Sequence, residues 1–285
     1  MQKIRKRKTL QELTIKDNFM FGAVMLDEEN CRRFLEIVLG FPIEKVEVDR
    51  EKSMVYNPDF KGVRLDILAK DEAGTRYNVE MQAVKQQALG KRSRYYHSQM
   101  DMELLLSGEE YDSLPNTYVI FICDFDPFGK GKFRYTFETK CRESDTVVAE
   151  DGRISIFLST HGQNEQEESE ALVNFLKYVR AGLEVSMDDY EDEFVRKLQQ
   201  TVKKVKQSRE MGVRYMAWHE MLKEERDEGK IEGRIESIME LLEELGEIPE
   251  ELREKIEEQE ELTIIKSWHK LAAKADSIEH FMEQM

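Results

Sequence analysis

The sequence predicts an α/β fold with a mixed central β-sheet flanked by helices, followed by an all-α C-terminal tail. Two observations lead to this prediction. Between residues 43 and 158, runs with the alternating or continuous apolar patterns of strands surround one long helical stretch. Beyond about residue 165, every apolar pattern has helical spacing. We therefore expect a sheet-containing domain over residues 1–190 and an acidic helical region over residues 191–285.

The N-terminal elements are a helix and a first strand. Apolar side chains recur near helical spacing over residues 17–40, and Gly40 and Pro42 close the segment. Residues 43–52 alternate weakly between apolar and polar side chains and predict a strand.

A β-hairpin gives the strongest pattern. Val63, Leu65 and Ile67 alternate with Arg64, Asp66 and Leu68, residues 77–82 alternate in the same way, and the turn-forming residues 71–74 lie between the two runs. Residues 85–107 then predict a long helix, because apolar side chains form one stripe along it.

The remaining strands and helices follow in two groups. Residues 118–123 are continuously apolar, as in a strand buried on both faces, and residues 133–139 and 154–158 predict two more strands. The expected helices of the second half cover residues 171–180, 190–240, 250–258 and 262–283.

Composition limits the class of protein. No apolar run approaches the roughly 20 residues that span a bilayer, so we expect no membrane partner. The three cysteines, Cys31, Cys123 and Cys141, are widely spaced, which fits a reducing cytoplasm better than a disulfide framework or a zinc site.

The net charge of −16 is unevenly distributed. Residues 1–16 carry six basic side chains and one acidic side chain, whereas residues 222–261 carry seventeen acidic and six basic ones. The tail therefore supplies most of the negative charge, and the net charge does not exclude an anionic partner for the front of the chain.

Three polar residues interrupt the predicted hairpin on one face. Asp66 points away from its apolar neighbours, and Glu80 and Gln82 share a face of the next strand, about 7 Å apart by strand geometry. In a hairpin these side chains can converge, and two carboxylates with a carboxamide suit a hard divalent cation such as Mg²⁺. The competing interpretation is an ordinary half-exposed hairpin, in which outward-facing acids need no function.

Several short motifs, in this order, resemble the PD-(D/E)xK nuclease family, and more closely its branch of recombination-promoting nucleases and transposases. The similarity covers roughly residues 13–160. The matching stretches are Lys16–Phe21, Arg64–Ala69, Asn78–Gln82, Arg94–Tyr96 and Gly108–Tyr111.

The resemblance implies a restriction-endonuclease-like core and a metal-dependent endonuclease that hydrolyses phosphodiester bonds in DNA. It implies Asp66 and Glu80 as the ligands of Mg²⁺, for which Mn²⁺ can substitute, and Gln82 as the residue that positions the attacking water. Three basic residues are candidate DNA contacts, and three other residues are accessory candidates. The DNA contacts are Lys85, Arg92 and Arg94, and the accessory residues are Glu36, Asp17 and Tyr95.

Each accessory candidate has a structural alternative. Asp17 fits the N-cap of a helix, Glu36 a solvated helix position and Tyr95 a packing position. His97 is expected on the surface of its helix or facing a phosphate, not as a ligand.

Gln82 departs from the wider superfamily, which has a lysine at this position. A carboxamide can orient water but carries no charge. On the sequence alone, Gln82→Lys is therefore expected to keep or raise cleavage.

The alternative function is a catalytically silent module of the same fold. In that case the C-terminal helices, which we expect to form a short bundle, would mediate self-association into a homo-oligomer.

Overall fold

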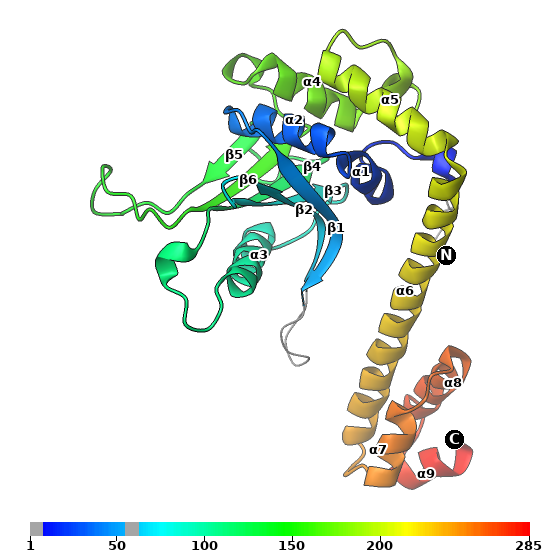
Figure 1. Ribbon diagram of the computed structural model, residues 1–285. Helices are drawn as coiled ribbons and strands as arrows, with labels where there is room; N and C mark the ends of the chain where they lie inside the picture. The colour runs from blue at the N-terminus through cyan, green and yellow to red at the C-terminus, as the bar shows by residue number, and fades with distance from the viewer. Residues whose placement is uncertain (1–7, 55–62) are drawn as a thin grey trace. The chain divides into compact units, whose positions relative to one another are not determined.

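The computed structural model describes residues 8–54 and 63–285 (Figure 1). The chain divides into two compact units between Gly212 and Val213. The described part of the first unit contains the β-sheet, and the second unit is helical.

Among the described residues, six strands form one mixed sheet in the order β1-β2-β3-β4-β6-β5. The strands are β1 (Val46–Met54), β2 (Val63–Asp71), β3 (Arg76–Gln82), β4 (Thr117–Cys123), β5 (Arg134–Phe137) and β6 (Arg153–Ser159). β1, β2 and β3 pair antiparallel, β4 lies parallel to both β3 and β6, and β5 closes the edge antiparallel to β6. This arrangement confirms the predicted hairpin and the mixed sheet.

The strand β4 lies in the middle of the sheet, and all seven of its side chains are buried. A parallel strand with neighbours on both edges and helices on both faces needs apolar side chains in both directions. Its continuous run, Tyr118 to Cys123, meets that requirement.

Helices cover both faces of the sheet in the first unit (Figure 1). α3 lies on one face, and the other four helices lie on the opposite face. The helices are α1 (Asn18–Met25), α2 (Glu28–Leu39), α3 (Leu89–Leu104), α4 (Glu170–Arg180) and α5 (Glu193–Gln207). Short 3-10 turns occur at Leu10–Glu12, Tyr111–Ser113, Glu165–Glu167 and Val185–Met187.

The predicted single helix over residues 17–40 is wrong, because the segment forms two helices. Asp27 begins α2 by accepting a hydrogen bond from the Asn30 amide at 3.0 Å. An aspartate in extended conformation at this position competes with helix continuation by capping a new one. Gly40 ends α2 as predicted, with a left-handed φ of 79°.

The helix predicted over residues 85–107 is shorter, Leu89–Leu104. Ala88 precedes it with a positive φ of 59°, which sets the chain outside helical geometry at that point. Lys85 consequently lies in the loop before α3, not on the helix.

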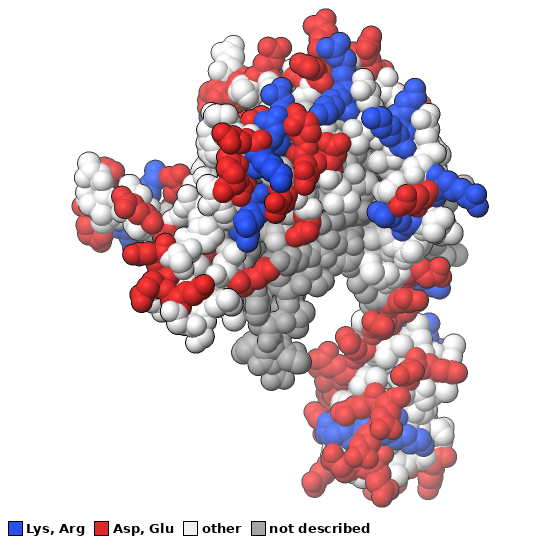
Figure 2. Space-filling view, viewed as in Figure 1, with Lys and Arg blue, Asp and Glu red and all other residues white. Residues whose placement is uncertain are grey.

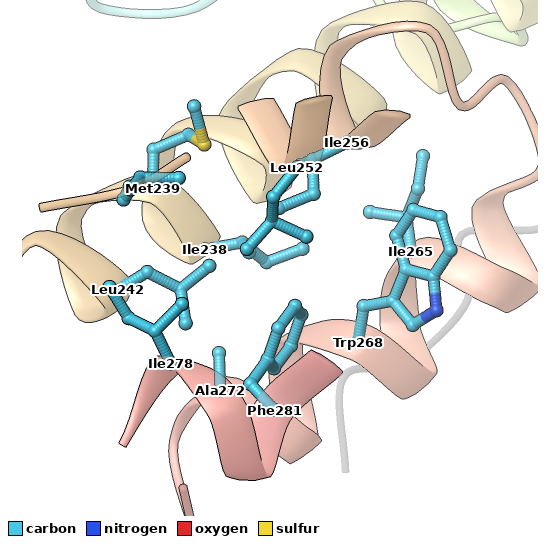
Figure 3. Close-up of a cluster of buried hydrophobic side chains, with 11 residues drawn as sticks. Ile238, Met239, Leu242, Leu252, Ile256, Ile265, Trp268, Ala272, Ile278 and Phe281 are labelled. Atoms are coloured by element: carbon cyan, nitrogen blue, oxygen red, sulfur yellow. The ribbon is translucent and has the colours of Figure 1, made fainter. Parts of the chain in front are cut away.

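The second unit has a hydrophobic core of its own (Figure 3). Its helices are the C-terminal part of α6 (Arg209–Glu243), α7 (Glu250–Glu257), α8 (Leu262–Ala272) and α9 (Ile278–Gln284). Side chains from all four helices meet there: Ile238 and Leu242 from α6, Ile256 from α7, Ile265 and Trp268 from α8, and Phe281 from α9.

In the part of the chain that the structure describes, no helix is both long enough and apolar enough to cross a bilayer.

A truncation series tests where the first folding unit ends. The helix α5 lies beyond the boundary predicted at residue 190, yet it packs against α1, α2 and α4 and buries Phe194, Val195 and Leu198. We expect a chain ending at Gly212 to unfold cooperatively, as followed by circular dichroism on heating. A chain ending at Tyr190 should be destabilised by several kcal/mol, because full burial of each such side chain contributes about 1.5–3 kcal/mol. Equal melting temperatures for the two truncated chains would contradict a structural role for α5.

Candidate functional site

Two carboxylates close the sheet where β2 and β3 separate. The last paired residues of the two strands at this end are Ile67 and Val79. One residue further along, the Asp66 amide donates to Glu80 Oε1 at 3.2 Å. The Met81 amide in turn donates to Asp66 Oδ2 at 3.1 Å. Each carboxylate thus accepts a backbone N–H of the opposite strand, and this exchange holds the two acids face to face.

Glu80 is nearly inaccessible to solvent, with 2% of its surface exposed. Burial and, next, the charge of Asp66 raise the pKa of its carboxyl to about 8, although the Asp66 amide and Arg92 oppose the shift. A carboxyl with such a pKa is largely protonated at neutral pH unless a cation approaches it. The positive charge near the two acids is therefore too small to keep both of them ionised at neutral pH.

Gln82, two residues further along the same face of β3, is also buried, at 7% exposure. Its Oε1 accepts a hydrogen bond from Arg92 Nη1 at 3.0 Å. Arg92 Nη2 donates to the hydroxyl of Tyr96 at 2.7 Å and lies 3.5 Å from Glu80 Oε2. The guanidinium therefore links Glu80 and Gln82 on β3 to α3.

The helix α3 presents Arg92 to the sheet because Leu89, Arg92 and Tyr96 follow one another at helical spacing on the side that faces it. The guanidinium carbon lies 5.4 Å from the centre of the Tyr96 ring and 5.5 Å from that of Phe121 on β4. Aromatic faces attract a cation at this distance.

The three basic residues predicted as DNA contacts are placed differently. Lys85 and Arg94 are exposed, in the loop before α3 and on its outer surface. Arg92 is directed inward, toward Glu80 and Gln82.

The accessory candidates Asp17 and Glu36 have partners in other parts of the fold. Asp17 occupies the N-cap position of α1 without a capping bond from its side chain, which accepts from the Thr14 amide and pairs with Lys8. Glu36 Oε1 accepts from Arg32 at 2.7 Å and from the Ile43 amide at 3.1 Å, which ties α2 to the chain that enters β1. Tyr95 packs, half-buried, against the hydrophobic cluster beneath α3.

The expectation that His97 lies on the helix surface is wrong. It is 1% exposed and faces the sheet, where its ring nitrogens bond Thr117 Oγ1 at 2.8 Å and Ser155 Oγ at 3.1 Å. Burial, followed by the charge of Arg153, lowers the pKa of His97 to about 4, so it is neutral near pH 7. Its role is to satisfy buried hydroxyl groups.

Among the described residues, no cluster of three or more His, Cys, Asp or Glu side chains could hold a metal. The donor set at this site is two carboxylates and one carboxamide. Mg²⁺ is usually held by one or two carboxylates, with waters and substrate phosphate oxygens completing its shell. Asp66 and Glu80 fit such an ion, because a divalent cation between them would allow both to be ionised.

The comparison with protein families agrees with this geometry. A family model described as PD-(D/E)XK nuclease family transposase matches residues 16–233. The chain belongs to this family. The match extends from the residue before Asp17 into α6, and so includes Asp66, Glu80 and Gln82 as well as the whole sheet. Neither the search of curated proteins nor the search of solved structures gave a match.

The mixed sheet with helices on both faces is that of a PD-(D/E)XK nuclease-like fold, as predicted. What the sequence did not reveal is the inward direction of Arg92 and its bond to Tyr96. The spacing of Leu89, Arg92 and Tyr96 could have indicated that Arg92 faces the sheet, since residues at i, i+3 and i+7 share a helix face.

The raised pKa of Glu80 predicts how stability depends on pH. A carboxyl whose pKa is about 8 when folded and about 4.5 when unfolded holds a proton in the folded state alone between those values. Its contribution to stability is thus full below pH 4.5 and is lost as pH rises toward 8. We expect Glu80→Gln to remove a decline in unfolding free energy that approaches about 1.4 kcal/mol per pH unit.

Urea unfolding of wild type and Glu80→Gln between pH 5 and 8, in the presence of a chelator, measures this difference. The matched control is Asp112→Asn, which neutralises an exposed acid. Parallel pH profiles for wild type and Glu80→Gln would show that Glu80 titrates at its ordinary pKa.

Proposed function

We propose that this PD-(D/E)XK nuclease family transposase is a metal-dependent endonuclease that hydrolyses phosphodiester bonds in DNA and promotes recombination. The observation that carries the proposal is the pair formed by the buried Glu80 and the half-buried Asp66, each of which accepts a backbone N–H of the opposite strand, with the buried Gln82 alongside. A buried carboxyl whose pKa is raised by burial and by a neighbouring acid is costly to retain unless a cation binds it.

Each residue would have a separate task. Asp66 and Glu80 would hold Mg²⁺ or Mn²⁺, which when bound lowers the pKa of water and offsets charge on the phosphate. Gln82 would orient the attacking water. Because its Oε1 already accepts from Arg92, its NH₂ group is the end that can donate to that water or to a phosphate oxygen.

The proposed reaction is simple hydrolysis. The water oxygen forms a bond to phosphorus, the bond from phosphorus to the leaving oxygen breaks, the water loses a proton to solvent and the leaving oxygen gains one. The rate depends on how well the protein orients the phosphate for in-line attack as well as on how well it activates the water.

The distribution of charge is compatible with a DNA substrate. Figure 2 shows acidic side chains gathered over the C-terminal helical unit, whereas basic and acidic side chains are mixed over the first unit. The exposed Lys85 and Arg94 lie before and on α3, the helix that also carries Arg92. We propose that they contact the phosphate backbone.

Two broader features belong to the same proposal. The three cysteines are free, in keeping with action in the cytoplasm. Self-association through the C-terminal helices stays a prediction, which light scattering on the full chain and on a chain ending at Gly212 would test.

Removal of either carboxylate should slow cleavage strongly while the fold is kept. We expect Asp66→Asn and Glu80→Gln each to slow plasmid nicking in Mg²⁺ by about 100-fold or more, the size typical of losing one preorganised electrostatic contact. Asp112→Asn is the control for loss of one surface charge, and a chelator is the control for the metal.

If the wild type neither nicks DNA nor binds Mg²⁺ or Mn²⁺ in a calorimetric titration, the nuclease proposal fails. The catalytically silent module would then be the better interpretation.

Phosphate contacts should be visible in the salt dependence of binding. With Asp66→Asn as the uncleaving parent, we expect Lys85→Ala and Arg94→Ala each to weaken DNA binding and to reduce the slope of log K against log salt by about one. Fluorescence anisotropy measures both quantities. The control is Lys177→Ala on α4, which lies on the other side of the sheet and pairs with Glu165. Unchanged slopes for both α3-side variants would remove them from the DNA surface.

A further inference from the structure

The guanidinium of Arg92 lies at the site in a position that its neighbours define. Gln82 Oε1, Gln86 Oε1 and the Tyr96 hydroxyl each accept a hydrogen bond from it, and the rings of Tyr96 and Phe121 lie against it. Arginine presents a planar fork that matches such directional acceptors. The side chain retains 28% exposure, so it is only partly closed off from solvent.

These hydrogen-bonding partners are all neutral. The one charged group close to Arg92 among the contacts described is Glu80, whose Oε2 lies 3.5 Å from Nη2. A divalent cation bound to Glu80 would take up the negative charge of that carboxylate. The guanidinium would nevertheless stay where Gln82, Gln86 and Tyr96 hold it, with its positive charge available to another anion.

We propose that Arg92 supplies, from α3, the positive charge that Gln82 does not carry, and that it contacts the phosphate being cleaved. The inference rests on the proposed nuclease function and adds a catalytic residue to that site. It also assigns Gln82 a second task, because its Oε1 orients the guanidinium.

The contact between Arg92 and Gln82 changes what Gln82→Lys should do. In the wild-type background the new ammonium would lie against the guanidinium, 3.0 Å from Nη1 if it took the place of the amide oxygen. Two like charges at this distance disfavour each other, so the substitution should lower cleavage. In an Arg92→Ala background the same ammonium would be the single cation of the pair and should restore cleavage.

The experiment compares Arg92→Ala, Arg92→Lys, Gln82→Lys and the double variant Gln82→Lys/Arg92→Ala. Single-turnover plasmid nicking is measured at saturating Mg²⁺, and Mg²⁺ affinity is measured separately by calorimetry. We expect Arg92→Ala to cleave about 100-fold to 1,000-fold more slowly, as when a transition-state contact is removed. Arg92→Lys should retain part of the activity, and the double variant should regain at least about 10-fold over Arg92→Ala, because either ammonium would restore a positive charge at the phosphate.

Metal affinity separates a catalytic charge from a structural one. Removing a cation beside Glu80 should leave Mg²⁺ binding unchanged or tighter in Arg92→Ala, whereas a collapsed site would bind Mg²⁺ more weakly. Lys91→Ala is the matched control, since it removes an exposed charge from the adjacent position of α3. Thermal melting confirms that each variant is folded.

Three results would overturn the inference. Arg92→Ala could cleave as fast as the wild type, or it could lose Mg²⁺ affinity in parallel with cleavage, or the double variant could be no faster than Arg92→Ala. In each of these cases a cleaving wild type leaves the nuclease proposal intact. A wild type that does not cleave rejects the proposed function, and the role of Arg92 with it.

Discussion

Placing the carboxylate of Glu80 inside the fold requires that its charge be balanced, and much of the site follows from this requirement. Transfer of an ionised carboxyl from water into a protein interior is strongly unfavourable unless hydrogen bonds and opposite charges replace its hydration. The described structure meets part of the need with the Asp66 amide and the nearby guanidinium of Arg92, and the pKa of Glu80 remains raised. A bound cation would meet the rest, so the resting site is built around a deficit of positive charge.

The surrounding strands and helix α3 hold the side chains of the site in fixed positions. β3 lies between β2, its antiparallel partner in the hairpin, and the parallel strand β4, so its backbone is held from both edges. The helix α3 covers the face that carries Glu80, and Phe121 and Phe157 stack at 5.2 Å beneath it. Close-packed aromatic rings exclude water, and exclusion of water strengthens every charge interaction at the site. The second unit is rich in acidic side chains and has a core of its own, and none of the residues of the site comes from it.

The sequence predicted the sheet and the pairing of acids better than it predicted the surroundings of the site. Alternation directed Asp66 and Glu80 away from their apolar neighbours, and the register that pairs Ile67 with Val79 brings the two acids onto one face. The break at Asp27 was missed, since a cap and a continuing helix differ by a hydrogen bond whose outcome depends on packing. The burial of His97 and the direction of Arg92 were missed for another reason. Their partners, Thr117, Ser155 and Glu80, come from three different strands. Helical spacing alone does not say which of these polar residues meets which side chain of α3.

At the end of the β2–β3 pairing, side-chain carboxylates accept backbone hydrogen bonds in place of backbone carbonyls. This affects which substitutions an inactive relative could tolerate. Asp66 and Glu80 accept the backbone N–H groups that would otherwise be unpaired where the strands part. A substitution that shortens either side chain leaves a strand amide without its acceptor and costs stability together with chemistry. Inactive descendants that still fold should therefore be enriched in Asn and Gln at these two positions, and large apolar replacements should be rare. On the proposed function, the acids of this site would be kept by two selective pressures, one on the reaction and one on the sheet.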